Sequence, residues 1–194
     1  WDKFWRNWKV LKRVIWVFVP TAGLGFVFYR LIKQWLVGNL RVTVVSLVVG
    51  GIVMIVLEQY FLRSKPGGKI EKLSLKQALV LGVIQAISVV PGVSRAAATI
   101  FGGMALGLSR SEATELSFLV AVPVMAVATG YDLLKNIKDF RGNQFELLLL
   151  GMVGAFVTAM ITVKWLTDYV KNHDFRGFGV YRIVVGVIFG VMGR

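Results

Sequence analysis

Apolar residues run along most of the chain in stretches that short polar and basic segments separate. A stretch of roughly 20 predominantly apolar residues is long enough to cross a bilayer as a helix. The pattern predicts spans at residues 14–29, 42–62, 111–134, 145–170 and 178–192. Residues 1–13 alternate aromatic and basic side chains, which is typical of a segment in the headgroup region. We therefore expect residues 1–194 to form one all-α, polytopic integral membrane bundle.

The segment 74–106 departs from the pattern of a simple span. Ser74 is a suitable cap for a first helix, and Ser94 for a second that continues to about residue 106. Between them, Pro91 lacks a backbone donor and Gly92 allows a turn. Two half-helices that meet at a polar turn predict a broken or re-entrant pair, which membranes tolerate where the backbone is buried or lines a cavity. The distribution of basic residues leaves open whether this pair returns to its starting face.

Composition and charge restrict the class of protein further. The chain is 56% hydrophobic and carries a net charge of +13, with its basic residues in clusters between the apolar runs. This is the pattern of cytoplasmic loops, and it places the basic segment 63–72 on the cytoplasmic side. It does not favour nucleic-acid binding, for which no motif is present. The absence of cysteine excludes disulfides and thiolate metal sites, and His173 lies in a polar link typical of a solvated residue.

The turn between the half-helices combines groups that suit a phosphate. The first amides of a helix beginning near Ser94 carry partial positive charge. Arg95 adds a planar cation, Thr99 adds a hydroxyl, and Ser94 is also a candidate nucleophile. Gln85 is an interior amide that either joins helices or contacts ligand. The alternatives are a snorkelling Arg95, a plain Pro-Gly kink, and hydroxyls satisfied by the preceding turn.

Three other charged residues within the apolar runs have simpler interpretations. Glu58 lies near the end of its span and is followed by basic residues, which favours an interfacial ion pair. Asp132 precedes Lys135 by three residues, which favours a surface pair on a helix. Arg182 lies early in the last span, where we expect it to snorkel toward the headgroups.

At the turn, the sequence resembles a known family. Residues 91–95 (Pro-Gly-Val-Ser-Arg) followed by Thr99 are similar to the PGxSRSxxT motif of the undecaprenyl-diphosphate phosphatase family, also called the bacitracin-resistance family. Residues 102–110 and 117–123 resemble its continuation. Ala96 departs from the motif, because the family usually has a second serine there. The resemblance and the turn chemistry together lead us to expect catalytic roles for Ser94, Arg95 and Thr99, and substrate contacts from Gln85, Pro91, Gly92, Val93 and Ala96.

The resemblance implies a function. Members hydrolyse undecaprenyl diphosphate to undecaprenyl phosphate and inorganic phosphate, which recycles the carrier lipid of cell-wall synthesis. We accordingly expect a multi-pass protein of the bacterial inner membrane. Its expected partners are the lipid diphosphate, membrane lipid and, in a homo-oligomer, a second copy of the chain.

The resemblance also implies a divalent cation, Mg²⁺ or Ca²⁺. The family holds it with a glutamate-rich motif and a downstream histidine in an N-terminal re-entrant segment, related to the PGxSR segment by an inverted repeat. Residues 1–41 do not match that motif. We therefore expect the chain to lack this segment, and we assign no metal ligand within residues 1–194.

Two alternatives remain open at the level of the residues. Broken helices whose N-termini point at an anion also hold substrates in secondary transporters, so a transporter or lipid flippase is one. A non-catalytic membrane protein that binds lipid headgroups at this turn is the other. A glutamate motif in the full gene product would favour the enzyme.

Overall fold

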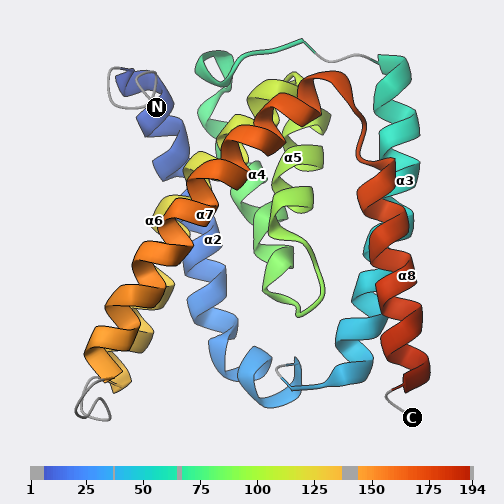
Figure 1. Cartoon of the computed structure of the whole chain (residues 1–194). Helices are drawn as coiled ribbons and strands as arrows, with labels where there is room; N and C mark the ends of the chain where they lie inside the picture. The colour runs from blue at the N-terminus through green and yellow to red at the C-terminus, as the bar shows by residue number, and fades with distance from the viewer. Residues whose placement is uncertain (1–6, 37, 65–66, 137–143, 193–194) are drawn as a thin grey trace.

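The computed structural model describes residues 7–36, 38–64, 67–136 and 144–192, and most of these residues are helical (Figure 1). The long helices are α2 (Trp8–Leu31), α3 (Leu40–Ser64), α6 (Arg110–Asn136), α7 (Gln144–Asn172) and α8 (Arg176–Met192). Between α3 and α6 lie the shorter helices α4 (Leu75–Ala86) and α5 (Arg95–Ala105). Short π and 3₁₀ segments are η1 (Ile32–Leu36), η2 (Ile70–Lys72) and η3 (Ile87–Val89).

The long helices contain all five predicted spans and extend them at one end or both. Four carry a stretch long and apolar enough to cross a membrane: Trp8–Phe28, Leu40–Leu62, Arg110–Lys135 and Phe145–Val170. The fifth, α8, has 17 residues and is about 25 Å long at 1.5 Å per residue. These helices confirm the predicted polytopic bundle.

The start of the chain differs from the prediction of a separate headgroup segment over residues 1–13. Residues 1–6 lie outside the described part, but from Trp8 onward the chain already belongs to α2. The apolar side chains of Val10 and Val14 are buried in the core, so this stretch packs as part of the long helix. Residues 8–13 are therefore continuous with the first span, and the predicted headgroup location of residues 1–13 stays a prediction.

The helices α4 and α5 form a hairpin that returns to the end of the bundle where it began. Just ahead of α4, the Gly68 amide donates to the Gly107 carbonyl at 2.9 Å, and the Ser109 amide donates to the Gly68 carbonyl at 2.9 Å. Figure 1 shows the hairpin between α2 on one side and α3 and α8 on the other, with its turn short of the opposite end. Both ends of the pair therefore lie at the same end of the bundle, which is the arrangement that a re-entrant pair requires.

Polar caps fix where these helices begin. Ser74 forms a full capping box with Gln77, in which each side chain accepts from the other residue's amide. Ser109 caps α6, because its hydroxyl accepts from the Glu112 amide at 3.3 Å. The Glu112 carboxylate accepts from the Ile70 amide at 3.0 Å, and the Ser109 amide donates to Gly68, so this cap is not a capping box. The start of α6 is therefore tied to η2 ahead of the hairpin.

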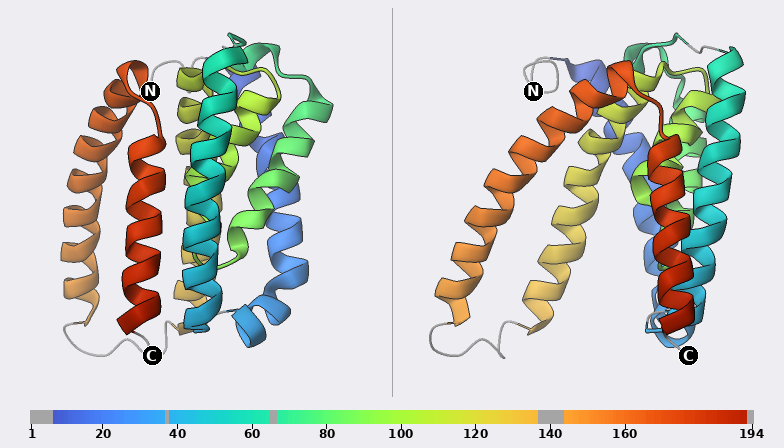
Figure 2. Two further views of the ribbon diagram at one scale, coloured as in Figure 1. Left: turned by 90° about the vertical axis from the view of Figure 1, so that its right-hand side faces the viewer. Right: turned by 45° about the vertical axis from the view of Figure 1, so that its right-hand side comes forward.

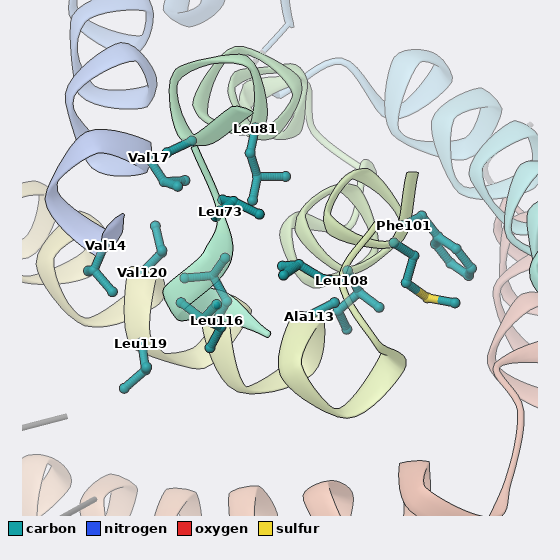
Figure 3. Packing of buried hydrophobic residues seen from close by; sticks show 14 of the residues in the cluster. Val14, Val17, Leu73, Leu81, Phe101, Leu108, Ala113, Leu116, Leu119 and Val120 are labelled. Atoms are coloured by element: carbon teal, nitrogen blue, oxygen red, sulfur yellow. The ribbon is translucent and has the colours of Figure 1, made fainter. Parts of the chain in front are cut away.

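The core lies where α2, α4, α5 and α6 meet (Figure 3). Helix α2 continues through Pro20, and α4 approaches it at Gly82, where a Cβ atom would lie 2.3 Å from the Val17 carbonyl oxygen. The Thr21 hydroxyl donates to the Gly82 carbonyl at 2.9 Å and completes this contact. A side chain at position 82 would separate α4 from α2 and move the hairpin.

Helices α3 and α8 lie side by side (Figure 2) and hold the other flank of the hairpin. A Cβ on Gly51 would lie 2.6 Å from the Gly179 carbonyl oxygen, and one on Gly179 would lie 2.9 Å from the Gly51 carbonyl oxygen. Small residues at such contacts let helix backbones approach closely in a membrane. Gly51 and Gly179 therefore allow α3 and α8 to pack closely.

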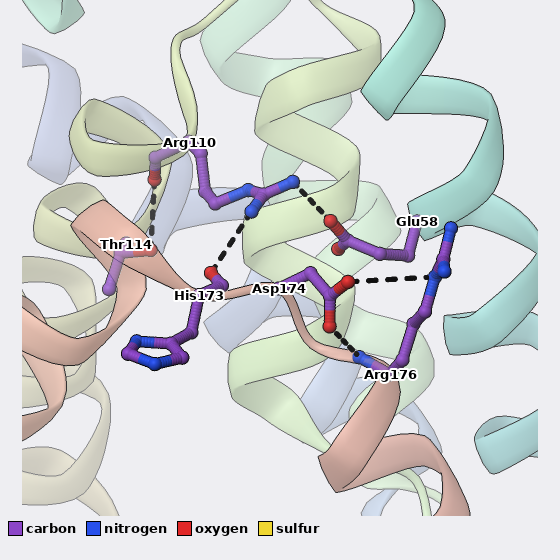
Figure 4. A network of polar contacts seen from close by, with 6 residues as sticks. All are labelled: Glu58, Arg110, Thr114, His173, Asp174 and Arg176. Carbon is purple, nitrogen blue, oxygen red and sulfur yellow. Dashed lines mark hydrogen bonds and ion pairs between the residues drawn. The ribbon is translucent and has the colours of Figure 1, made fainter.

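A polar network joins α3, α6 and the link between α7 and α8 at the end where the hairpin enters (Figure 4). Arg110 forms an ion pair with the fully buried Glu58 and also donates to the His173 carbonyl at 3.1 Å. Among the described side chains, the partner of Glu58 comes from α6, whereas the side chains of the basic residues that follow Glu58 lie outside the described part. His173 is exposed, as expected, and its ring stacks on Tyr169.

Candidate functional site

The turn between α4 and α5 has the geometry that its Pro-Gly pair predicts. The Val93 amide donates to the Val90 carbonyl at 3.0 Å and closes a four-residue turn. Gly92 has a φ of +89°, and Val90 is extended, as expected for a residue before proline. Pro at the second position and a positive-φ Gly at the third define a type II turn. The chain thereby reverses direction inside the bundle.

Ser94 caps α5, as predicted. Its Oγ accepts a hydrogen bond from the Ala97 amide at 3.2 Å. The amides of Arg95 and Ala96 precede the first intrahelical bond and leave partial positive charge at this helix end. The serine oxygen that was a candidate nucleophile is therefore engaged in holding the helix start.

Arg95 lines a pocket of about 400 Å³ between α2, η3, α5 and α6. Its Nη1 is buried and has no hydrogen-bond partner within the described part of the chain. The polar or charged residues that share this pocket are Thr21, Ser88, Tyr131 and Asp132. An arginine with a buried, unused donor in a pocket is placed to bind an anion, which favours the functional interpretation of Arg95 over snorkelling.

Asp132 lies in the same pocket, although the sequence favoured a surface pair for it. The residue is exposed, and it comes from the second half of α6, far from the turn in sequence. The two residues line one pocket because the hairpin places the start of α5 beside the second half of α6.

A second pocket of about 340 Å³ lies between α3, α4, α5 and α8. Its lining is almost entirely apolar, and the two residues with polar side chains are Ser94 and Arg182. The two pockets share no lining residue. The structure therefore places Ser94 and Arg95, neighbours in sequence, toward different cavities on either side of α5.

Gln85 and Thr99 join the two arms of the hairpin. The Thr99 hydroxyl shares its proton between Gln85 Oε1 and the Arg95 carbonyl one turn earlier, each at 3.0 Å. Thr99 and Gln85 are buried, with exposed fractions of 1% and 0%. Neither lines either pocket. Gln85 Nε2 is buried without a hydrogen-bond partner among the described residues. Of the two roles that the sequence left open for Gln85, this contact supports the joining of helices.

Replacing Thr99 by Val should lower the free energy of unfolding by about 1–3 kcal/mol, because it leaves the buried Gln85 oxygen without its donor. Thr99→Ser keeps the hydroxyl and should retain most of the stability. The measurement is unfolding in detergent. Thr158→Val is the matched control: that hydroxyl bonds only to the carbonyl one turn before it, on an exposed part of α7, so its loss should change little. Equal effects at both positions would contradict the assigned role.

The described residues do not form a divalent cation site. No group of three or more Asp, Glu, His or Cys side chains comes together in the part of the chain that the structure describes. Mg²⁺ and Ca²⁺ prefer several oxygen ligands, and the pocket of Arg95 offers one carboxylate, Asp132. The residues present therefore fit an anion but not the metal that the resemblance implies.

Sequence reasoning missed the part that Arg182 plays at the turn. The side chain was expected to snorkel, but its Nη2 donates to the Gly92 carbonyl, so this prediction was wrong. The available signal was a charged residue inside an apolar span, which usually faces protein.

Comparisons with known proteins identify the family. Residues 2–188 match the family model described as bacitracin resistance protein BacA. An undecaprenyl-diphosphatase of Aquifex aeolicus is 44% identical over 184 residues, which cover 95% of this chain and 72% of that protein. One from Bdellovibrio bacteriovorus is 42% identical over 189 residues, covering 97% and 72%. One from Persephonella marina is 40% identical over 189 residues, covering 97% and 74%. The chain is a multi-pass membrane protein that belongs to the BacA family.

Proposed function

We propose that this chain carries the phosphate-binding part of an undecaprenyl-diphosphatase of the bacterial inner membrane. One observation carries the proposal: Arg95 begins α5 and lines a pocket, and its Nη1 is buried without a hydrogen-bond partner among the described residues. A helix N-terminus and an arginine together form an anion site. The relatives named undecaprenyl-diphosphatase supply the substrate.

The two pockets suit the two parts of such a lipid. The pocket of Arg95 would take the diphosphate, because it combines the guanidinium with hydroxyl groups from Ser88 and Tyr131. The apolar pocket on the other side of α5 offers a surface for the adjoining prenyl units. Ser94 borders this second pocket at the helix start and holds the amides of α5 in place.

The reaction breaks the phosphoanhydride bond. An oxygen nucleophile attacks the terminal phosphorus, the bridging P–O bond breaks, and undecaprenyl phosphate leaves with the bond's electron pair. Water supplies the remaining oxygen and protons, so the products are undecaprenyl phosphate and inorganic phosphate. Arg95 and the amides of α5 would stabilise charge on the phosphoryl oxygens, which is the main contribution of a protein to phosphoryl transfer.

We place the cation ligands outside residues 1–194. A divalent cation would neutralise phosphate charge when bound, but the described residues lack the oxygen cluster that would hold it. The curated relatives are longer than the matched region, which covers 72% of the Aquifex aeolicus protein. The carboxylates that complete the site would come from the unmatched portion.

The test is phosphate release from undecaprenyl diphosphate in detergent with added Mg²⁺ or Ca²⁺. It compares residues 1–194 with the full open reading frame from which they come. We expect release from the full product and little or none from residues 1–194 alone. Binding of the lipid diphosphate by the full product without hydrolysis would contradict the enzyme and favour the transporter or headgroup-binding alternative.

A further inference from the structure

Arg182 of α8 contacts the turn that presents the phosphate site. Its Nη2 donates to the carbonyl oxygen of Gly92, 90 residues away in sequence. Gly92 is the positive-φ residue of the type II turn, and the bond makes α8 a support for it.

The packing of α3 and α8 directs the guanidinium to this point. The close approach of Gly51 and Gly179 fixes α8 against α3 one turn before Arg182. Gly50 leaves room for the head group, since a Cβ there would lie 2.8 Å from Arg182 Nη2. The turn itself presses on α3, because a Cβ on Gly92 would lie 2.4 Å from the Thr43 carbonyl oxygen. The tip of the hairpin is therefore held between two helices.

The contact with the Gly92 carbonyl gives a reason for a charged residue inside an apolar span. The side chain is half-buried, its Nε is buried without a hydrogen-bond partner, and no salt bridge joins it to a described carboxylate. Moving a cation partly out of water without a counter-ion costs free energy. A cation on the Gly92 carbonyl polarises the same peptide unit, whose N–H belongs to Val93 and closes the turn onto Val90. The arginine thus strengthens the bond that shapes the turn.

We propose that Arg182 is a positioning residue, which holds the Gly92 turn so that Arg95 and the first amides of α5 stay aligned with bound phosphate. The effect of Arg182 on catalysis rests on the proposed function, whereas its contact with the turn is a property of the fold. The effect on catalysis follows because a displacement of about 1 Å in a bound group can cost on the order of 100-fold in rate.

The experiment has a catalytic arm and a conformational arm. In the full gene product, Arg182→Leu should lower kcat for phosphate release about tenfold or more, and Arg182→Lys, which keeps a donor, should recover part of the loss. Arg176 begins the same helix and is exposed, with an ion pair to Asp174. Arg176→Leu and Arg176→Lys are the matched controls and should leave turnover unchanged.

The conformational arm does not depend on hydrolysis. Residues 1–194 contain no cysteine, so a nitroxide on Ala96→Cys, an exposed position beside Arg95, reports the motion of the turn after any other cysteine is replaced. Arg182→Leu should increase the mobility of this label, and Arg176→Leu should not. If Arg182→Leu does not yield a monodisperse protein, Arg182→Gln replaces it with the same expectation.

The outcomes separate the two proposals. Increased mobility supports the positioning role even if the wild-type protein releases no phosphate, a result that would overturn only the proposed function. An unchanged label spectrum overturns the positioning role whatever the activity. Full turnover of Arg182→Leu in an active wild-type background also overturns it.

Discussion

Replacing Arg95 by Ala is expected to lower phosphate release from undecaprenyl diphosphate by about a thousandfold in the full gene product. The change removes the cation that we assign to the phosphoryl oxygens, and loss of one preorganised donor in a water-poor site costs about 100- to 1,000-fold. Arg95 lines the pocket, and its buried Nη1 has no other hydrogen-bond partner among the described residues, so we assign it as the donor to the ligand. The assay follows inorganic phosphate at saturating lipid and divalent cation.

Arg95→Lys distinguishes the geometry of the group from its charge. Lysine keeps the positive charge but cannot form the two parallel bonds of a guanidinium to phosphate, so we expect most of the loss to remain. Arg176→Ala serves as the control, since it removes an exposed arginine that lines neither pocket. Both Arg95 variants should keep the thermal stability of the wild type. Unchanged turnover of Arg95→Ala would remove this residue from the site.

The features of the fold that depend on local sequence could be predicted. The spans follow from runs of apolar residues, and the break follows from Pro91 and Gly92. Ser74 and Ser94 cap their helices as expected, because an N-cap depends on neighbouring residues alone. The motif around the turn also indicated the family before any geometry was known.

The features that depend on distant contacts could not be predicted. The partner of Glu58 is Arg110, 52 residues later, and Arg182 reaches Gly92 across 90 residues. From the sequence, each charged residue was expected to pair with a neighbouring residue or to reach the headgroups. In the fold, each contacts a residue from a distant segment instead. Ser94 and Arg95 were expected to act together, but Ser94 is the extended N-cap of α5 and Arg95 is its first helical residue. Their side chains consequently line different pockets.

The role of Gly92 can be tested against another glycine with the same backbone conformation. Gly92 and Gly107 have φ values of +89° and +97°, so a side chain at either position is strained. A Cβ on Gly107 would meet nothing within 4 Å, whereas one on Gly92 would lie 2.4 Å from the Thr43 carbonyl oxygen and 2.9 Å from the Ser46 Cβ. Only Gly92 lies against α3, so comparing the two variants isolates the contribution of this contact to stability.

Gly92→Ala should lower the free energy of unfolding by about 2–5 kcal/mol, as backbone strain of about 1–2 kcal/mol adds to overpacking of about 1–3 kcal/mol. Gly107→Ala should lower the free energy of unfolding by the strain contribution alone. Because the Thr43 oxygen belongs to a helix backbone, the turn must move away from α3 to admit the methyl group, and Arg95 moves with it. Phosphate release should therefore fall by about 100-fold in Gly92→Ala and little in Gly107→Ala. Unfolding in detergent and turnover of the folded fraction measure the two effects separately. Equal loss of stability in both variants would show that the hairpin tip does not depend on its contact with α3.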